Sequence, residues 1–485
     1  MKSFVKSTVL FFAIFAAITL GACKPSVSSN APESFTVTYK TDHGTAPTTI
    51  TVEQDTVLTQ AQLPALTCTG YVFLGWYDAE TKAEAGKYKV TRDVTLSAKW
   101  NKVNDFELPL TFEFINAGNV TVSNPWSTLK YSKNGGSLVA YTEAITAQAG
   151  DKICLYAKEF ENTPNGMWIS CSEDCYIYGN IMSIVTLNEQ TGEWNPYETT
   201  LRSGNFYQLF SGNTHIKNHR VVKLYLPATT LENFNYGFMF AGCTGLTEAP
   251  ALPATTLAPS CYSFMFVGCT GLTEAPVLPA TMLAPSCYYA MFSGCTGLKK
   301  VPDLKATTLA YGCYSAMFIG CEGLTKAPAI KAMTLADFCC QQMFSGCTSL
   351  KEVPDLLATT LAESCYYEMF YGCTNLEKAP ALPATTLARA CYKEMFYGCT
   401  SLTESPLLPA PSLVPACYNR MFYGCTKLNK VKCLVTGSFS NSYDYIDCWL
   451  TGVSSTGTFI LQPPFIWPSV ENNGIPSDWT FESYQ

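Results

Sequence analysis

Residue patterns that could support catalysis or bind a metal ion are sparse in this sequence of 485 residues. Its three histidines are His43, His215 and His219. The last two have the four-residue spacing that can bind zinc on a helix, but Asn213 and Asn218 beside them favour a loop. The sequence has no nucleophile elbow, no glycine-rich phosphate loop and no cysteine–histidine pair with an orienting group. We therefore expect no enzymatic activity, no metal site and no cofactor.

Fifteen of the 23 cysteines fall into two columns that repeat every 26 residues. The columns are Cys243, Cys269, Cys295, Cys321, Cys347, Cys373, Cys399 and Cys425, and Cys261, Cys287, Cys313, Cys339, Cys365, Cys391 and Cys417. Within one unit, an expected short helix would separate Cys261 from Cys269 by about 12 Å, beyond the reach of a disulfide. No Cys-x-x-Cys zinc knuckle occurs. We interpret both columns as small buried thiols, whereas Cys171 and Cys175 either form a disulfide or are simply buried.

Carboxylates also recur in the repeat, and paired carboxylates can hydrolyse glycosidic bonds. One repeat position holds Glu248, Glu274 and Glu404, and also Lys300, Lys326 and Lys378. A position shared by both charges predicts a solvated, mixed surface rather than an acid–base pair.

The strict period decides the architecture that would position any site. A Met-Phe pair and a Gly-Cys pair keep the 26-residue step through eight units, which predicts a solenoid over residues 221–431. Cys261 and Met265, like Tyr262 and Phe266, are four residues apart, so we expect a two-turn helix in each unit. Paired threonines predict a short strand before that helix. A recurring proline, Pro276 in this unit, predicts a bend beside the sheet.

Variable positions within fixed units are the expected source of binding specificity. The residue before the repeat glycine is Tyr371, Tyr397 or Tyr423 in the last three units, and Tyr366, Tyr367, Tyr392 and Tyr418 lie nearby. Tyrosine offers a large amphipathic contact area at low entropic cost. We hypothesise that Tyr371, Tyr397, Tyr423 and Tyr367 contact a protein partner. The alternative is that these rings only pack one helix on the next.

The N-terminus has the pattern of an export signal. Lys2 and Lys6 precede an apolar stretch that is too short to span a bilayer. The stretch ends in Leu20-Gly21-Ala22-Cys23, which resembles the bacterial lipobox. The resemblance implies a signal peptide over residues 1–22 and acylation of Cys23 as the only membrane attachment. The alternative is an ordinary secretory signal with a chance cysteine.

Residues 23–33 are expected to form a tether, and residues 34–101 a first small domain. The run Gly70-Tyr-Val-Phe-Leu-Gly-Trp-Tyr77, with the Ala-x-Trp end at Trp100, resembles the Listeria–Bacteroides repeat. This resemblance implies a β-grasp-like spacer module of bacterial surface proteins. A carbohydrate site on Trp76 and Tyr77 is one reading, and packing of these rings in the core is the other.

Residues 102–220 alternate apolar and polar residues between turns, which predicts a β-sandwich-like domain. Trp126, Trp168 and Trp194 could form a sugar platform there or serve the core. After Val431 the period is lost while aromatic residues continue, so we expect residues 432–485 to cap the repeats.

The repeated block Met-Phe-x-Gly-Cys-Thr-x-Leu-Thr-x-x-Pro resembles the BspA-like leucine-rich repeats. The resemblance implies a cell-surface lipoprotein that adheres to host matrix proteins or other bacteria, anchored in the bacterial envelope, at the outer membrane. A net charge of -7 with scattered lysines and arginines argues against a nucleic-acid partner. The alternative function is a glycan-binding accessory protein of a polysaccharide-uptake system.

Overall fold

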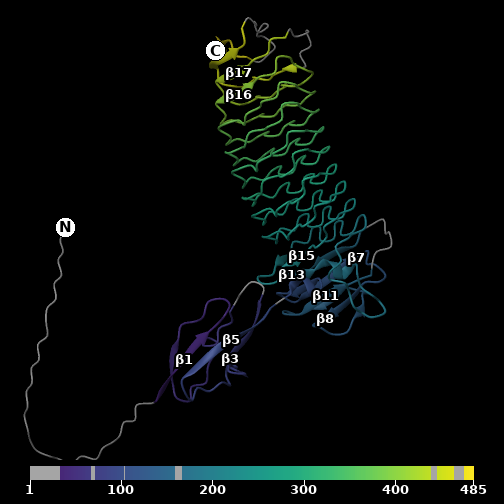
Figure 1. Ribbon diagram of the computed structural model, residues 1–485, viewed down its shortest axis with the longest axis vertical. Coiled ribbons are helices and arrows are strands. Elements are labelled where there is room, and N and C mark those ends of the chain that lie inside the picture. The colour runs from purple at the N-terminus through teal and green to yellow at the C-terminus, as the bar shows by residue number, and fades with distance from the viewer. Residues whose placement is uncertain (1–32, 67–70, 103, 159–165, 438–444, 464–474) are drawn as a thin grey trace, which may run out of the picture. The chain divides into compact units, whose positions relative to one another are not determined.

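The computed structural model of the protein describes residues 33–66, 71–102, 104–158, 166–437, 445–463 and 475–485 (Figure 1). The chain divides into two compact units, residues 1–68 with 72–101 and residues 69–71 with 102–485. The described residues contain strands and short 3-10 helices, among them η1 (Asp105–Glu107) and η2 (Ile181–Ile184), and no α-helix. The expectation of a multidomain, mostly β chain with a repeat region is confirmed.

The first unit is a five-stranded mixed sheet in the order β2-β1-β5-β3-β4. Its strands are β1 (Ser34–Lys40), β2 (Ile50–Glu53), β3 (Tyr71–Asp78), β4 (Thr81–Lys82) and β5 (Val94–Lys102). β1 pairs in parallel with β5, which brings Val37 and Leu96 into one hydrophobic cluster. Trp76 is fully buried in this cluster, and its indole nitrogen donates to a backbone carbonyl at 2.8 Å. The ring of Tyr77 lies under the ammonium of Lys99. Trp76 is therefore a core residue.

The second unit begins with two sheets. The smaller sheet, in the order β10-β7-β12, consists of β7 (Gly118–Ser123), β10 (Ile145–Ala147) and β12 (Trp168–Cys171). The larger sheet follows the order β14-β13-β6-β11-β8-β9, with β15 paired to β13. Its strands are β6 (Thr111–Phe114), β8 (Lys130–Lys133), β9 (Val139–Ala140), β11 (Lys152–Tyr156), β13 (Cys175–Asn180), β14 (Ile216–Asn218) and β15 (Leu224–Tyr225). Phe112 of β6 and Val122 of β7 join the same hydrophobic cluster as the repeats. The sheets and the repeats therefore share one core.

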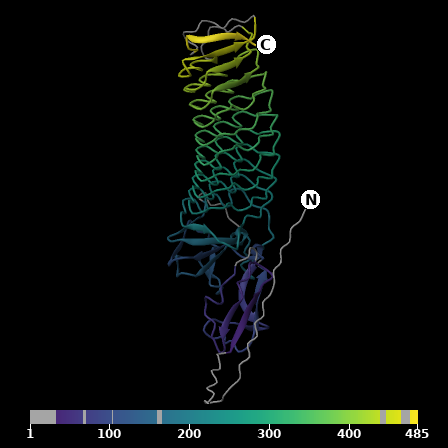
Figure 2. The same ribbon diagram turned by 90° about the vertical axis from the view of Figure 1, so that its left-hand side faces the viewer.

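The repeats form a stack of coils, one coil per unit (Figures 1 and 2). Along one stretch of each coil, successive backbone N–H groups donate alternately to a carbonyl of the same coil and to a carbonyl of the next coil. Cys261, Met265 and Cys269 donate to the carbonyl three residues earlier in their own coil. Between them, Tyr262 and Phe266 donate to carbonyls of the next coil, 25 residues ahead. Every N–H of this stretch is thus satisfied by a turn or by the neighbouring coil, which is why the stack is stable without helices.

The predicted two-turn helix is wrong. The segment from Ala258 to Cys269 is a chain of overlapping β-turns. Ser260, Phe264 and Gly268 have positive φ angles of 56°, 58° and 71°, which a right-handed helix does not allow. The left-handed residues recur every four positions, so turns of this kind produce the same four-residue spacing of buried side chains as a helix. The i,i+4 pattern alone could not distinguish the two structures.

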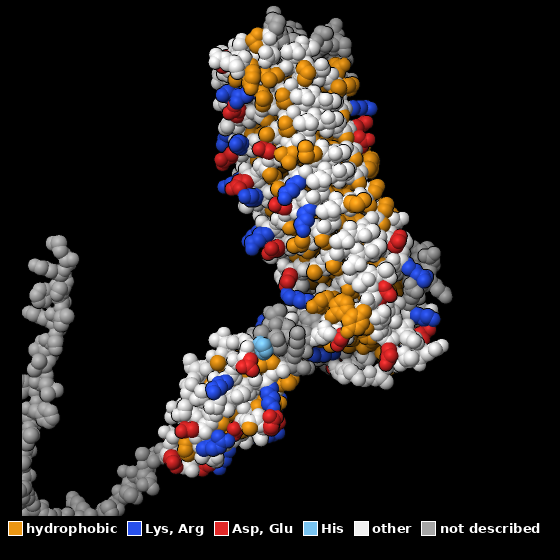
Figure 3. Space-filling model, viewed as in Figure 1, with side chains coloured by type: hydrophobic (Ala, Val, Ile, Leu, Met, Phe, Trp, Pro, Cys, Tyr) orange, Lys and Arg blue, Asp and Glu red, His pale blue; other side chains and the backbone are white. Residues whose placement is uncertain are grey.

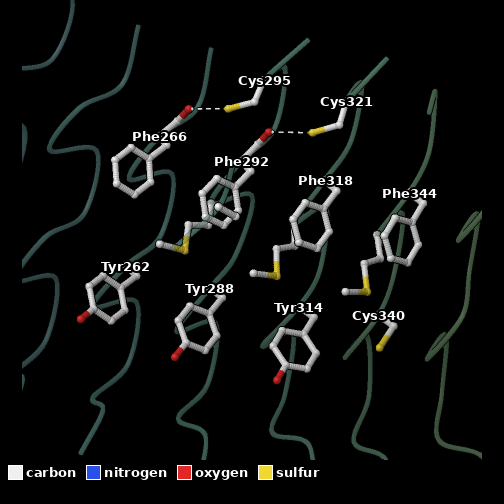
Figure 4. Close-up of a cluster of buried hydrophobic side chains, with 14 of the residues drawn as sticks. Tyr262, Phe266, Tyr288, Phe292, Cys295, Tyr314, Phe318, Cys321, Cys340 and Phe344 are labelled. Carbon is white, nitrogen blue, oxygen red and sulfur yellow. Dashed lines mark hydrogen bonds between the residues drawn. The ribbon is translucent and has the colours of Figure 1, made fainter. Parts of the chain in front are cut away.

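The core of the coil stack consists of parallel rows of identical side chains. Figure 4 shows the tyrosine and phenylalanine rows, in which Phe266 and Phe292 stack with ring centroids 5.5 Å apart, and Tyr262 and Tyr288 at 5.7 Å. Cys340 takes the place of a tyrosine in one coil (Figure 4). These rings are fully buried because each coil covers the one before it.

The cysteine of each Gly-Cys pair is more than an apolar filler. Its Sγ donates to the backbone carbonyl of the phenylalanine in the preceding coil, as Cys295 does to Phe266 at 3.0 Å (Figure 4). The same bond recurs along the whole column, from Cys243 to Cys425. Among the described cysteines, none of those in the two columns is in a disulfide.

The coils extend beyond the expected bounds of 221–431. An additional coil precedes them, since Phe210 donates to the carbonyl of Met239 and stacks on Phe240 at 5.5 Å. Another follows, in which Trp449 stacks on Tyr418 at 6.0 Å. Phe210 and Phe240 are 30 residues apart rather than 26, so the 26-residue period does not reveal the first coil.

The stack ends in a parallel sheet in the order β16-β17-β18-β19 (Figure 2). Its strands are β16 (Glu404–Leu408), β17 (Lys430–Cys433), β18 (Thr456–Leu461) and β19 (Asp478–Ser483). Phe459 of β18 and Trp479 of β19 are buried, and these side chains close the apolar interior of the last coils.

Candidate binding surfaces

Three of the four predicted tyrosines form a ladder on the last repeats. The rings of Tyr371 and Tyr397 stack with centroids 4.6 Å apart, and those of Tyr397 and Tyr423 at 4.8 Å, with interplanar angles of 10° and 9°. All three are half-buried. Stacking covers the ring faces that the tyrosines turn toward one another. The ladder therefore offers mainly ring edges and hydroxyl groups to solvent. We call these three residues, together with Tyr367, the tyrosine ridge.

Charged side chains flank the tyrosine ridge. The Lys393 ammonium lies 5.2 Å from the Tyr367 ring centroid and 3.8 Å from the Glu394 carboxylate. The Gln342 amide donates to Glu368 at 2.7 Å. Burial, followed by the adjacent Glu368 carboxylate, raises the pKa of Glu394. The ridge thus combines aromatic edges with partly buried carboxylates and a cation.

The remaining tyrosines of the last repeats have a different environment. Tyr366, Tyr392 and Tyr418 are fully buried, and they stack in the interior row at 5.9 and 6.0 Å. Of the seven tyrosines named in these repeats, only Tyr367 and the three that precede the repeat glycine reach the surface.

The mixed column of glutamate and lysine forms ion pairs between coils. Glu274 pairs with Lys300 at 3.8 Å, and Lys326 with Glu352 at 3.2 Å. Their side chains are 66–76% exposed, so each pair contributes little to stability. Each of these carboxylates therefore faces a lysine of the neighbouring coil, as the mixed column predicts.

An apolar cavity of about 780 Å³ lies where the first coils meet β13 and β15. Its lining is mostly apolar and includes Pro250, Pro253, Pro276 and Pro279. Figure 3 shows apolar side chains gathered on the coil stack near the end that joins the sheets. Proline lacks an N–H, so this wall offers apolar contact and few donors.

A second, more polar cleft of about 510 Å³ opens on the two-sheet part of the unit. It is lined by Glu107, Ser132, Tyr156, Glu193 and Trp194 and by glycines. Trp194 is the only one of the three candidate platform tryptophans in this cleft. Trp126 packs partly buried against the core, and Trp168 is 46% exposed elsewhere. Sequence reasoning missed the cleft because its walls come from four separate segments.

The two histidines with zinc-like spacing have separate hydrogen-bond partners. They flank the short strand β14 rather than lying in one loop. His215 Nδ1 lies 3.2 Å from Asp174, and His219 Nδ1 accepts from the backbone N–H groups of Val221 and Val222. Within the described ranges, no three histidine, cysteine or carboxylate side chains are grouped as metal ligands.

Cys23 and the predicted signal peptide lie outside the described residues. In the part of the chain that the structure covers, no helix has the length and hydropathy to cross a bilayer.

The fold therefore defines a multidomain β protein with a repeat region, and the comparisons name both of its recognisable parts. Residues 35–99 match the Listeria-Bacteroides repeat domain. Residues 339–450 match the BspA type leucine rich repeat region, in six copies. No curated protein and no solved structure matches the chain. Repeats of the second kind suggest protein–protein interaction at a surface, and both kinds of repeat are typically non-catalytic.

Proposed function

We propose that this protein is a non-enzymatic lipoprotein of the bacterial cell envelope that binds other proteins through its coil stack. The tyrosine ridge is the observation that supports this function. Three stacked rings and their charged neighbours gather on the last repeats, at a position occupied in earlier coils by Ala241, Val267, Ser293, Ile319 and Ser345. A rigid ladder loses little conformational freedom on binding, which favours affinity.

The partner we propose is a protein of the host matrix or of another bacterial surface, so that the function is adhesion. The repeat family supports a protein partner. Mixed charges around the ridge favour contacts with polar protein surfaces.

Binding of the full chain to immobilised fibronectin, laminin and collagen tests the ridge. The triple variant Tyr371→Ser, Tyr397→Ser, Tyr423→Ser should lose at least about tenfold in affinity for the bound protein. Tyr311→Ser, which removes a tyrosine that is 55% exposed on another coil, is the matched control and should bind normally. A triple variant that is only less stable, with unchanged affinity when folded, would refute the ridge as a binding surface.

The anchor is proposed from the lipobox-like sequence at Cys23, and it implies attachment to the outer membrane. Labelling of growing cells with radioactive palmitate tests it. The wild-type chain should carry the label, and Cys23→Ala should lose it and leave the membrane fraction. Retention of label by the variant would contradict lipidation at Cys23.

A second candidate function is glycan binding by an accessory protein of polysaccharide uptake. The specific observation that favours it is the polar cleft, because Trp194, one of the predicted platform residues, lines it beside two carboxylates.

A further inference from the structure

We infer that the cleft around Trp194 is a binding site for a neutral oligosaccharide; this inference rests on the second candidate function. A pyranose has an apolar C–H face and a rim of hydroxyl groups. Its recognition therefore needs an aromatic surface and hydrogen-bond acceptors in one cleft. Trp194 supplies the ring, and the carboxylates of Glu107 and Glu193 supply the acceptors.

The cleft is held open by a buried polar side chain. The Asn180 amide is fully buried and donates to the carbonyl of Phe106 at 3.0 Å and to that of Pro196 at 2.9 Å. One of these carbonyls is next to Glu107, and the other is two residues from Trp194. A single side chain thus ties both walls together, so that little ordering is needed when a ligand binds.

The loop that carries Trp194 is also fixed by its own hydrogen bonds. The backbone N–H of Asn188 donates to the carbonyl of Glu193 at 2.7 Å, and that of Asn195 donates to the Thr186 hydroxyl at 3.1 Å. Trp194 packs partly buried against the core, which fixes its ring. The aromatic surface is therefore rigid.

A second aromatic ring stands beside the cleft. Tyr197 is 64% exposed, yet its hydroxyl donates to Glu107 at 2.7 Å and its ring lies 5.6 Å from that of Phe106. The ring is thus held in place while most of its surface stays in water. An oligosaccharide that extends beyond the cleft could continue onto this ring, so we expect chains of several sugars to bind more tightly than single sugars.

The remaining wall includes glycines and leaves open space. Gly135 and Gly192 have positive φ angles, and a Cβ at Gly135 would meet no atom within 4 Å. Tyr156 also lines the cleft, and its phenol is protonated at neutral pH because burial raises a pKa that is already near 10 to about 12. The cleft volume of about 510 Å³ lies within the range of small-molecule sites. Two carboxylates in the lining disfavour acidic sugars.

Isothermal titration of the full chain tests the inference. The probes are cellohexaose, xylohexaose, mannohexaose and maltohexaose, with hexagalacturonate as an acidic saccharide and hexalysine as a cationic peptide. At least one neutral hexasaccharide should bind, and at least about tenfold more tightly than hexagalacturonate. Binding of hexalysine in place of every neutral saccharide would overturn the ligand class.

Variants locate the site. Trp194→Ala should weaken binding of the neutral hexasaccharide by about tenfold or more. Glu193→Gln changes an exposed side chain, so the variant should fold normally and still bind more weakly. Trp168→Ala is the matched control and should leave the affinity unchanged. Saccharide binding that neither cleft variant weakens would refute the cleft but leave the glycan function standing. Absence of binding by every neutral probe would refute both.

Discussion

The Sγ atoms of Cys171 and Cys175 lie 3.2 Å apart, and both side chains are buried. Cys171 ends β12 and Cys175 begins β13, so the pair joins the two sheets of the second unit. This contact differs from the thiol column of the coil stack, where each Sγ donates to a backbone carbonyl.

We predict that Cys171 and Cys175 form a disulfide when the chain folds in the presence of an external disulfide such as oxidised glutathione. Two S–H bonds break and one S–S bond forms, while the two electrons and the two protons pass to the external disulfide, whose S–S bond breaks to give two thiols. The neighbouring Cys171 thiol, and then burial, raises the pKa of Cys175. Reaction in the folded state should therefore be slow, and refolding is the stage to test.

Peptide mapping measures this disulfide directly. Trypsin should release residues 159–202 as one peptide whose only cysteines are this pair. After oxidative refolding and alkylation, the peptide should have lost two hydrogen atoms and carry no alkyl group. The peptide of residues 306–326, with Cys313 and Cys321 from the coil stack, is the internal control and should be alkylated twice. Two alkyl groups on residues 159–202 would show that the pair is simply buried.

The thiol column predicts an unusual order of substitution costs. Cys295 donates to the Phe266 carbonyl, so Cys295→Ser keeps a donor and Cys295→Ala removes it. We expect the alanine variant to lose about 1–2 kcal/mol of unfolding free energy and the serine variant to lose less. Urea denaturation of both variants measures the difference. If the thiol were only an apolar filler, the order would reverse, because serine would bury a hydroxyl group.

The sequence predicts the repeat architecture well because each buried row consists of residues that are 26 positions apart in the sequence. Each Met265 or Phe266 must meet its equivalent in the next coil, so the 26-residue step of the core is visible in the residues themselves. The local backbone was mispredicted for a physical reason. Left-handed residues such as Ser260 and Phe264 are not glycine, so the sequence carries no marker of their turns.

The tyrosine ridge and the cleft show the same contrast at the level of sites. Tyr371 and Tyr397 occupy equivalent positions in neighbouring coils, so their contact follows from the period. Glu107 and Trp194 share no period and lie 87 positions apart in the sequence. Their proximity depends on the tertiary fold and on the buried Asn180, which no local pattern marks.

Because the first coils pack closely, we predict that replacing a glycine in one column of the repeat strongly lowers the free energy of unfolding. A Cβ at Gly297 would lie 2.3 Å from the carbonyl oxygen of Thr270 in the preceding coil. Gly297→Ala should therefore cost about 3 kcal/mol of unfolding free energy, since backbone must move. Later coils carry Ser349, Asn375, Ser401 and Lys427 at this position.

Two matched variants separate crowding from backbone strain, and urea denaturation again supplies the measurement. Gly268→Ala has room for its Cβ, 3.8 Å from the nearest atom, but a φ of 71°, so it should cost only about 1 kcal/mol. Ser401→Ala, in the same column as Gly297, should be nearly neutral. Equal losses for Gly297→Ala and Gly268→Ala would contradict the crowding argument.

Glu394 predicts how stability depends on pH at the tyrosine ridge. Burial and then the Glu368 carboxylate raise its pKa above the ordinary 4.5, although Lys393 and Arg420 oppose the shift. Just above pH 4.5 the folded chain therefore holds a proton that the unfolded chain has lost, and this group's contribution to stability falls as pH rises through the folded pKa. Glu394→Gln should raise the Tm at pH 7.5 and change it little at pH 4, whereas Glu322→Gln, at an exposed position on another coil, should have no such effect. A lower Tm of Glu394→Gln at pH 7.5 would mean that its attraction to Lys393 and Arg420 outweighs burial and the repulsion from Glu368.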